Sequence, residues 1–162
     1  MDSGDLDAAY EGRFAELYTL AKRPAMRVLS NSDDAEDIAA ETLARLYLNW
    51  PRLVDHEGLK PWVLRVATNL AVDQIRRARR RKRPLSRAVT AVTEPDNHIV
   101  LVQAVGRLPR RQRQVVALRF FADLSDDEIA VALSVAVPTV RTHCQRALQS
   151  LESVLGPSRG DL

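Results

Sequence analysis

The sequence has little of what builds a disulfide scaffold or a metal centre. It contains one cysteine, Cys144, so no disulfide can form within the chain. Its three histidines, His56, His98 and His143, are scattered and do not show the spacing of metal ligands. We therefore predict no structural zinc, no other metal site and no cofactor.

Long apolar runs are missing as well. No stretch approaches the roughly 18 apolar residues that a membrane-spanning helix needs. The acidic start of the sequence, with Asp2 and Asp5, lacks the basic and apolar parts of a signal peptide. These two absences predict a soluble, cytoplasmic protein without membrane insertion.

Catalytic constellations are also lacking. The sequence has no glycine-rich phosphate loop, no nucleophile with a plausible base, and no carboxylate pair suited to acid–base work. His143 and Cys144 are neighbours, but adjacent helical side chains point about 100° apart and are poorly placed to act on one substrate group. We predict that the protein is not an enzyme.

What is present is helical periodicity along most of the 162 residues, with no β-rich segment and no internal repeat. The pattern predicts an all-α fold of two small helical domains joined by a flexible linker. The expected parts are a first domain at 1–83, a linker at 84–97, a second domain at 98–155 and a tail at 156–162.

The expected helices follow from apolar residues three or four positions apart and from proline and capping signals. They cover 5–29, a segment from 31–34 to Pro51, a segment from Pro61 into the basic block, 99–108, a segment from Pro109 to 121, 125–133, and about 138–155. Pro24 is expected to kink or split the first helix, and Pro51 to end the second.

Charge is segregated along the chain. Residues 1–41 hold 10 acidic and 4 basic side chains, net −6, whereas residues 42–83 hold 11 basic and 3 acidic ones, net +8. Residues 84–162 are close to neutral at +1. Such asymmetry indicates that one part binds a polyanion, and nucleic acid is the leading candidate.

The last two expected helices form a helix-turn-helix. Ser125 and Glu128 have the spacing of a capping box, and a short turn at 134–137 leads to the second helix. In such motifs the second helix enters the major groove of DNA. Val140, Cys144 and Leu148 are expected to face the core. The outward-facing candidates for DNA contact are Thr139, Arg141, Thr142, Gln145 and Arg146.

The helix from Pro61 has a polar stripe opposite its expected apolar side, which comprises Trp62, Val63, Val66, Leu70 and Ile75. Arginines on this stripe suit phosphate contacts. Trp62 has two interpretations, a stacking surface for an unpaired base or simple core packing. The stripe consists of Arg65, Asn69, Asp73, Arg76, Arg77 and Arg80.

An acidic face is expected on the preceding helix, where Asp37, Glu41 and Arg45 follow one another at i,i+4 spacing. Acidic side chains repel DNA. This surface therefore either faces solvent or binds a basic protein partner.

Several ordered sequence blocks resemble a known family. Residues 35–42, 61–63 and 69–77 are similar to region 2 of the extracytoplasmic-function sigma factors of bacterial RNA polymerase, and residues 108–113, 124–130, 139–142 and 146–148 are similar to region 4 of the same family. The resemblance covers about residues 10–155. It implies a promoter-specific transcription initiation factor that reads the minus-thirty-five and minus-ten elements and helps melt DNA.

The resemblance also implies partners for each surface. Asp37, Glu41 and Arg45 would bind the clamp coiled coil of the largest subunit of core RNA polymerase. The polar stripe with Trp62, together with Arg52 in the preceding loop, would engage the minus-ten element of promoter DNA. The helix-turn-helix would read the minus-thirty-five element and contact the polymerase flap. An anti-sigma factor is a further partner that the family admits.

The sequence departs from the family pattern at the turn before its last helix. The family usually has Gly-Ile-Ser there, whereas this chain has Ser134, Val135 and Ala136, and Pro138 replaces a frequent glycine. The serine that would cap the recognition helix is thus missing. Ala40 also stands where the family often has glutamine.

A second interpretation comes from another class of protein. Residues 128–130 and 139–143 also resemble the DNA-binding domain of response regulators, which bind duplex DNA without docking on core polymerase. Residues 35–83 favour the sigma factor, since no receiver domain has this pattern. An anti-sigma or adaptor protein that only shares the fold is disfavoured by the basic helix.

Overall fold

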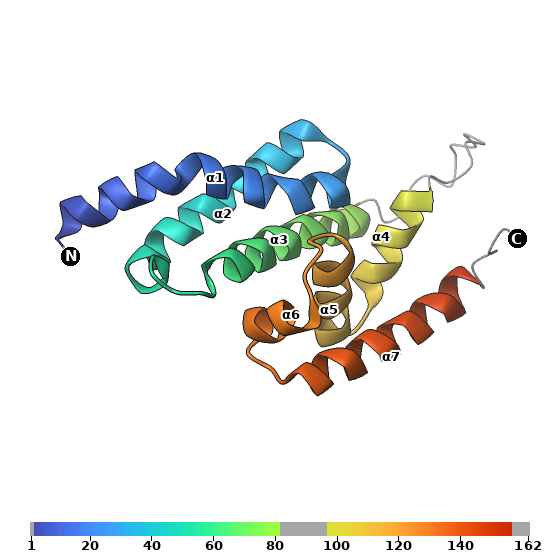
Figure 1. Cartoon of the computed structure of the whole chain (residues 1–162). Coiled ribbons are helices and arrows are strands. Elements are labelled where there is room, and N and C mark those ends of the chain that lie inside the picture. The colour runs from blue at the N-terminus through green and yellow to red at the C-terminus, as the bar shows by residue number, and fades with distance from the viewer. Residues whose placement is uncertain (1, 82–96, 157–162) are drawn as a thin grey trace, which may run out of the picture.

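The computed structural model describes residues 2–81 and 97–156, and this part of the chain contains seven helices and no strand (Figure 1). The helices are α1 (Ser3–Leu29), α2 (Ser32–Leu53), α3 (Leu59–Arg81), α4 (Asn97–Arg107), α5 (Arg110–Phe120), α6 (Asp126–Leu133) and α7 (Val137–Leu155). The all-α fold predicted from the sequence is confirmed. Residues 84–96 of the expected linker and 157–162 of the expected tail lie outside the described residues.

The expected split of the first helix at Pro24 and the expected end of the second helix at Pro51 do not occur. α1 continues through Pro24, and α2 extends past Pro51 to Leu53. An interior proline removes one helical hydrogen bond and costs about 3 kcal/mol in isolation. Pro24 is buried with Ala25 and Val28, and tertiary packing of this kind outweighs a local preference against helix. Pro61 lies in the first turn of α3, where its missing N–H is not needed.

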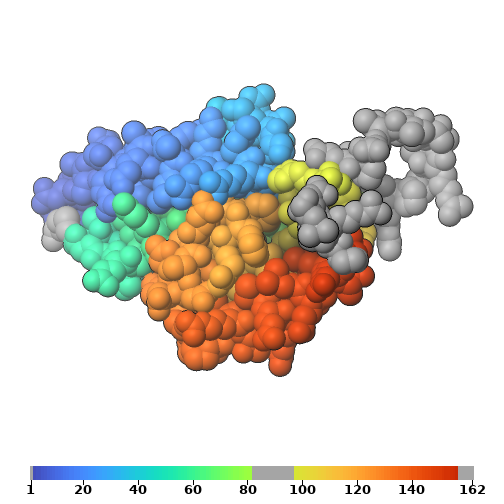
Figure 2. All heavy atoms as spheres, turned by 45° about the vertical axis from the view of Figure 1, so that its right-hand side comes forward, coloured from blue at the N-terminus to red at the C-terminus, as the bar shows by residue number. Residues whose placement is uncertain are grey.

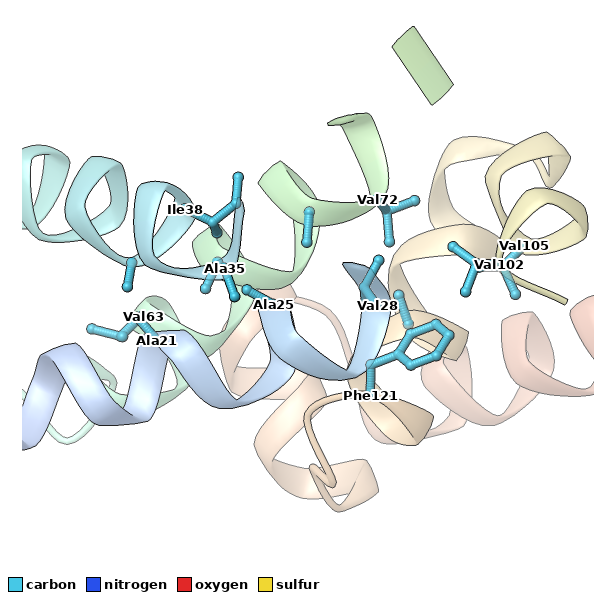
Figure 3. Packing of buried hydrophobic residues seen from close by; sticks show 14 of the residues in the cluster. Ala21, Ala25, Val28, Ala35, Ile38, Val63, Val72, Val102, Val105 and Phe121 are labelled. Carbon is cyan, nitrogen blue, oxygen red and sulfur yellow. The ribbon is translucent and has the colours of Figure 1, made fainter. Parts of the chain in front are cut away.

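The first three helices pack on one another around small and branched apolar residues. Figure 3 shows Ala21 and Ala25 of α1 close to Ala35 and Ile38 of α2. Trp50 is buried nearby, and its indole Nε1 donates a hydrogen bond of 2.9 Å to the carbonyl of Leu6. These contacts fix the orientation of α2 and α3, which carry two of the predicted binding surfaces.

Helices α4 to α7 form the second group. Apolar residues of α5, α6 and α7 build its core, among them Leu118, Ile129 and Val140, and Cys144 is buried with them. The expectation that Leu148 faces this core is wrong, because its side chain is 45% exposed. Ala147 and Leu151 are buried instead, since a helix of 3.6 residues per turn brings these positions back to the face of Val140.

The two groups of helices are packed against each other through α3. Leu64 of α3 belongs to the apolar cluster of α5 to α7, and Phe121, at the end of α5, lies beside Val28 of α1 (Figure 3). Helices α5 and α6 contact α3, and in the space-filling view the surfaces of the two groups adjoin (Figure 2). Polar contacts add to this junction: Arg27 pairs with Asp123, and a ring nitrogen of His98 lies 3.1 Å from the carbonyl oxygen of Val28.

This packing also changes the buried face of α3. Of the five residues expected on the buried side of this helix, only Val63 is fully buried. The other four are half-buried, namely Trp62, Val66, Leu70 and Ile75. α3 is covered from two sides, so its fully buried residues follow a wider surface, namely Leu59, Val63, Leu64, Ala67, Thr68, Ala71 and Val72.

None of the described helices combines the length and apolar character that crossing a membrane requires.

Candidate polymerase and nucleic-acid interface

The acidic face predicted on α2 is present and open to solvent. Asp37, Glu41 and Arg45 are all exposed. The Nε of Arg45 lies 2.7 Å from Oε1 of Glu41, as the i,i+4 spacing predicts. Asn31 caps the start of this helix by accepting a hydrogen bond from the backbone N–H of Asp34. The cap fixes where α2 begins and hence which side chains share the outer face.

The acidic face adjoins the basic end of α3. A groove of about 510 Å³ separates the two helices, with Asp37 and Glu41 on one wall and Arg77 and Arg81 on the other. Opposite charges face each other across it without a close ion pair among these four described residues. A basic partner on α2 and an anionic partner on α3 can therefore bind side by side.

The polar stripe of α3 does not face solvent along its whole length. Arg77 and Arg80 are exposed, but Arg65, Asn69, Asp73 and Arg76 are half-buried. A small cavity of about 110 Å³ is lined by Asn69 and Asp73 from α3 and by Arg110, Arg113 and Gln114 from α5. The N-terminal and central parts of the predicted minus-ten surface thus lie against the second group of helices.

Like charges meet where these surfaces touch. Burial, and after it the charges of Arg110 and Arg111, lower the pKa of Arg65 from its ordinary value. The Nε of Arg65 is buried without a hydrogen-bond partner in the described part of the chain. Around Arg65 the contact between α3 and α5 is therefore electrostatically unfavourable, whereas Asp73 of α3 attracts Arg113 of α5.

The remaining residues of the predicted minus-ten surface are Trp62, at the start of α3, and Arg52, which was expected in the loop but lies in the last turn of α2. Trp62 is half-buried at the edge of the core, so part of its ring stays accessible. Arg52 is exposed and donates a hydrogen bond of 2.9 Å to the side chain of Asn49. Both positions leave a side chain able to reach nucleic acid.

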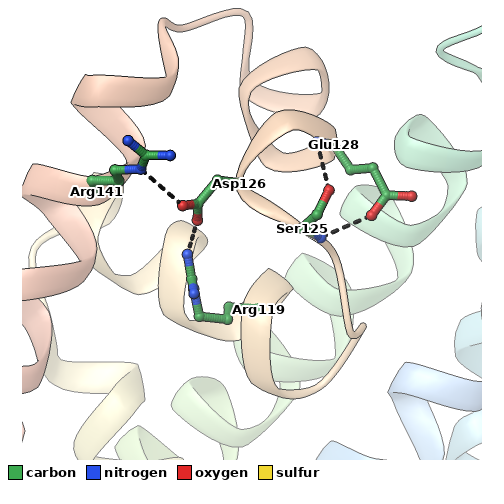
Figure 4. A network of polar contacts seen from close by, with 5 residues as sticks. All are labelled: Arg119, Ser125, Asp126, Glu128 and Arg141. Carbon is green, nitrogen blue, oxygen red and sulfur yellow. Dashed lines mark hydrogen bonds and ion pairs between the residues drawn. The ribbon is translucent and has the colours of Figure 1, made fainter.

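The helix-turn-helix predicted from the sequence is present as α6 and α7. Figure 4 shows the capping box, in which the Ser125 hydroxyl accepts from the N–H of Glu128 at 3.2 Å while the Glu128 carboxylate accepts from the N–H of Ser125 at 2.8 Å. Ser134 adopts a left-handed conformation, φ 54°, and ends α6. The motif presents the first turns of α7 outward.

The predicted base-reading residues lie together on that outward face. Arg141, Thr142, Gln145 and Arg146 are exposed, and Thr139 is half-buried. The Nε of Arg141 lies 3.2 Å from Oδ2 of Asp126. The Thr142 hydroxyl donates to the carbonyl of Pro138 at 3.0 Å, which leaves its oxygen able to accept.

Sequence reasoning missed Asp126 and its second partner, Arg119. Figure 4 shows the Asp126 carboxylate between Arg119 of α5 and Arg141 of α7. An acidic residue in the first turn of a helix was visible in the sequence as a favourable charge at the N-terminus. The ion pair between Asp126 and Arg141 was not visible in the sequence, because it depends on how α6 and α7 cross.

The start of α7 matches the departure noted in the sequence. Ala136 occupies the N-cap position and makes no side-chain hydrogen bond, and Pro138 lies in the first turn. Proline suits that position because the first helical N–H groups have no partner within the helix. The recognition helix begins at Val137, one residue before the expected start.

An apolar groove was also missed. It has a volume of about 500 Å³ and lies between α4, α5 and α7, and among its lining residues Leu101, Phe120, Leu148 and Leu155 are exposed. The available signal was the number of apolar residues on the expected last helix, which exceeds what one buried face requires. An exposed apolar groove of this kind marks an interaction surface.

Comparison with known proteins identifies the family. The model described as "Sigma-70 region 2" matches residues 14–81, and the model described as "Sigma-70, region 4" matches residues 98–151. "ECF RNA polymerase sigma factor SigW" of Bacillus subtilis is 29% identical over 94% of this chain and 91% of its own length. "ECF RNA polymerase sigma factor SigL" of Mycobacterium tuberculosis is 26% identical over 91% of this chain and 87% of its own length.

Two solved structures share the fold. The sigma factor RpoE of Bartonella quintana, solved with the anti-sigma factor NepR, has a TM-score of 0.58 and 19% identity, covering 93% of this chain and 98% of that one. CnrH, solved with the cytosolic domain of CnrY, has a TM-score of 0.61 and 20% identity, covering 93% and 94%. With its region 2 and region 4 domains, the chain belongs to the ECF group of the sigma-70 family and is a non-catalytic sigma factor that directs promoter-specific transcription initiation by RNA polymerase.

Proposed function

We propose that the acidic face of α2 docks on the clamp coiled coil of the largest subunit of core RNA polymerase. Asp37 and Glu41 support this assignment because they are exposed, one turn apart and directed away from the helices that pack on α2. The Glu41–Arg45 pair is half-exposed, so it can exchange for a basic partner at little cost. With core polymerase and promoter DNA as its partners, the protein would act in the cytoplasm.

The two DNA-reading tasks fall to different helices. α7 would read the minus-thirty-five element as duplex, through Thr139, Arg141, Thr142, Gln145 and Arg146. α3, with Trp62 and Arg52, would engage the minus-ten element and help hold the melted strand. The difference in exposure of the side chains supports this assignment of the two tasks. The DNA-reading residues of α7 are largely exposed, whereas Arg65, Asn69 and Asp73 of α3 are partly covered by α5. Minus-ten binding therefore requires the two domains to separate.

The apolar groove between α4, α5 and α7 is the proposed site for the polymerase flap. Its exposed apolar side chains suit the apolar face of a partner helix. An anti-sigma factor is a further proposed partner, since the similar sigma factor RpoE was solved in complex with the anti-sigma factor NepR. Such a factor would inhibit initiation by competing for the same kind of surface.

The response-regulator alternative accounts for less of the chain. It concerns only the helix-turn-helix part, whereas residues 14–81 match sigma region 2. The alternative also leaves the exposed acidic face of α2 without a partner.

The docking assignment is tested with the double variant Asp37→Lys/Glu41→Lys. We expect its affinity for core polymerase to fall by roughly tenfold or more, because reversing two charges at a contact costs on the order of 1–3 kcal/mol. Asp7→Lys/Glu11→Lys is the matched control, since these residues have the same spacing on an exposed part of α1. Circular dichroism checks folding. Unchanged binding of the α2 variant to core would remove α2 as the docking helix.

A further inference from the structure

An arginine-lined cleft lies between the two domains. It has a volume of about 650 Å³ and is bounded by the C-terminal half of α3, by α4 and by the start of α5, which run close together (Figure 1). Its lining residues are Ile75, Arg76, Arg79, Arg80, Gln103, Gly106, Arg107, Leu108 and Arg113. Five guanidinium groups from three helices therefore surround one cleft.

Within the described residues, the charge of this cleft is only partly neutralised. None of the described residues that line it is acidic. Asp73, outside the cleft, lies 3.2 Å from Arg76, but within the described ranges no ion pair joins Arg79, Arg80, Arg107 or Arg113 to a carboxylate. Burial, and after it the charge of Arg76, lowers the pKa of Arg113 despite the opposing effect of Asp73.

The walls of the cleft are held in place by specific contacts. The Nη1 of Arg113 donates a hydrogen bond of 2.9 Å to the carbonyl of Leu108, which fixes this side chain at the turn between α4 and α5. Gly106 of α4 faces Arg76 of α3, and a Cβ at Gly106 would lie 3.0 Å from Cγ of Arg76. The glycine thus permits the close approach of α4 to α3 that brings the arginines of both domains together.

We propose that this cleft binds a polyphosphate anion, such as inorganic tripolyphosphate or the triphosphate of a nucleotide, which bridges the two domains. Guanidinium groups fork onto phosphate oxygens and form charge-assisted hydrogen bonds. The volume of about 650 Å³ far exceeds that of a single phosphate group, and a chain of linked phosphates offers oxygens to arginines of all three helices. The Gln103 side-chain amide supplies a further donor.

Binding at this cleft has a consequence for the closed arrangement of the domains. The site exists only when α3 lies beside α4 and α5, so a bound anion stabilises that arrangement by linkage. Arg76 and Arg80 also belong to the proposed minus-ten surface, so the anion competes with DNA phosphates for them. The ligand would therefore oppose promoter opening.

The test uses the full chain without polymerase or promoter, so its outcome is independent of the proposed docking and DNA-reading roles. Titration calorimetry at about 150 mM salt, where long-range charge effects are largely screened, measures binding of inorganic tripolyphosphate, of orthophosphate and of a nucleoside triphosphate. The test variant is Arg79→Gln/Arg107→Gln, which removes two exposed cleft arginines that have no role in DNA reading here. The control is Arg13→Gln/Arg23→Gln, which removes two arginines from α1 outside the cleft.

We expect saturable binding of one tripolyphosphate, weaker binding of orthophosphate, and at least about a tenfold loss of affinity in the test variant with less than a twofold change in the control. If the nucleoside triphosphate binds with the same affinity as tripolyphosphate, the cleft recognises only the phosphate chain. If the nucleoside triphosphate binds more tightly, the ligand of the cleft is a nucleotide. Absence of saturable binding, or an equal loss in both variants, would overturn the proposal.

Discussion

At the scale of single residues, Asp126 links the helix-turn-helix to its own DNA-reading face. Its carboxylate lies at the first turn of α6, where negative charge is favoured, and contacts both Arg119 and Arg141. Arg141 is 69% exposed, so its ion pair with Asp126 contributes little to stability. Arg141 can therefore leave Asp126 for a base or a phosphate, whereas Arg119 continues to hold the carboxylate.

The first residue-scale prediction concerns Arg141 and Arg146. Replacing either with alanine is expected to weaken binding of region 4 to a minus-thirty-five duplex by about 1–3 kcal/mol, because each arginine loses a contact to a base edge or phosphate. An electrophoretic mobility shift with the full chain and a labelled duplex measures the change. Gln149→Ala, also exposed on α7, is the control.

The pattern of loss distinguishes the kinds of contact. An arginine that reads a base relaxes sequence preference at one position, whereas one that contacts phosphate weakens all sequences equally and lowers the salt dependence. Wild-type affinity in both variants would show that this face of α7 does not bind DNA.

Several residues behave as their sequence context predicts, and the exceptions have a common cause. Ser125 and Glu128 form their capping box because both partners lie three positions apart, within one turn. Arg65 and Asn69 are half-buried because α5, which is distant in the chain, lies beside them. Local spacing determines the first kind of feature, and only the packing determines the second.

At the scale of elements, the start of the recognition helix is weakly specified. Ala136 supplies no side-chain cap for α7, and Ser134 occupies a left-handed position that glycine adopts more readily. The family pattern, Gly-Ile-Ser, satisfies both positions. This chain therefore holds its helix-turn-helix with less local stabilisation at the turn.

Ala136→Ser is predicted to stabilise the protein by about 1 kcal/mol, because a serine hydroxyl at the N-cap accepts from a backbone N–H that has no helical partner. Thermal unfolding should show a rise of about 3 °C in Tm. Ala44→Ser adds the same hydroxyl at an exposed interior position of α2 and should not raise the Tm. A Tm of Ala136→Ser equal to that of the wild type would contradict the cap assignment.

The role of α3 leads to a different prediction, since its stripe acts after the duplex is bound. Asn69→Ala/Arg77→Ala is expected to leave minus-thirty-five binding intact and to reduce transcription from closed duplex by at least about tenfold, which corresponds to about 1.4 kcal/mol. A premelted bubble template should restore part of the activity. Gln74→Ala, on the same helix and outside the stripe, is the control.

Permanganate footprinting of the minus-ten region measures strand opening directly. Reduced thymine reactivity in the α3 variant, with wild-type reactivity in Gln74→Ala, is the expected result. Unchanged reactivity in the Asn69→Ala/Arg77→Ala protein would show that this helix does not help to open DNA.

Helix positions were largely predictable from the sequence, but what covers them was not. The expected starts and ends agree with α4 to α7 within about two residues, because periodicity and capping are local. The helix continues through Pro24 because burial outweighs the intrinsic preference of proline, whereas Pro51 is exposed and α2 extends only two residues beyond it, to Leu53. The stripe of α3 had the period of a solvent-facing surface, and the residues that cover it, Arg110 and Arg113, lie more than 30 positions away in the chain.

At the scale of the whole molecule, two opposing effects meet at the junction of the domains. Apolar contacts hold it together, through Leu64 in the cluster of α5 to α7 and Phe121 beside Val28. Crowded arginines oppose it, with Arg65 facing Arg110 and Arg111. Such a junction can be stable in the free protein and still open when polymerase or DNA binds one of the two surfaces more tightly in the open form.

Leu64 provides the sharpest test of this balance. Its side chain is 4% exposed although α3 belongs to region 2, because it packs against region 4 residues such as Val115 and Leu118. Leu64→Gln places a polar group there and is expected to cost the closed arrangement about 2–3 kcal/mol, enough to shift the ratio of closed to open molecules roughly 30- to 150-fold.

Small-angle X-ray scattering should then show a larger radius of gyration for Leu64→Gln, while circular dichroism shows unchanged helix content because the cores of both domains remain. Leu64→Met is the matched control, since it keeps the volume and apolar character of the side chain and should stay compact. If docking and minus-ten binding require the open form, Leu64→Gln should also bind a premelted minus-ten template more tightly than the control. A radius equal to that of the wild type would mean that Leu64 does not hold the two domains together.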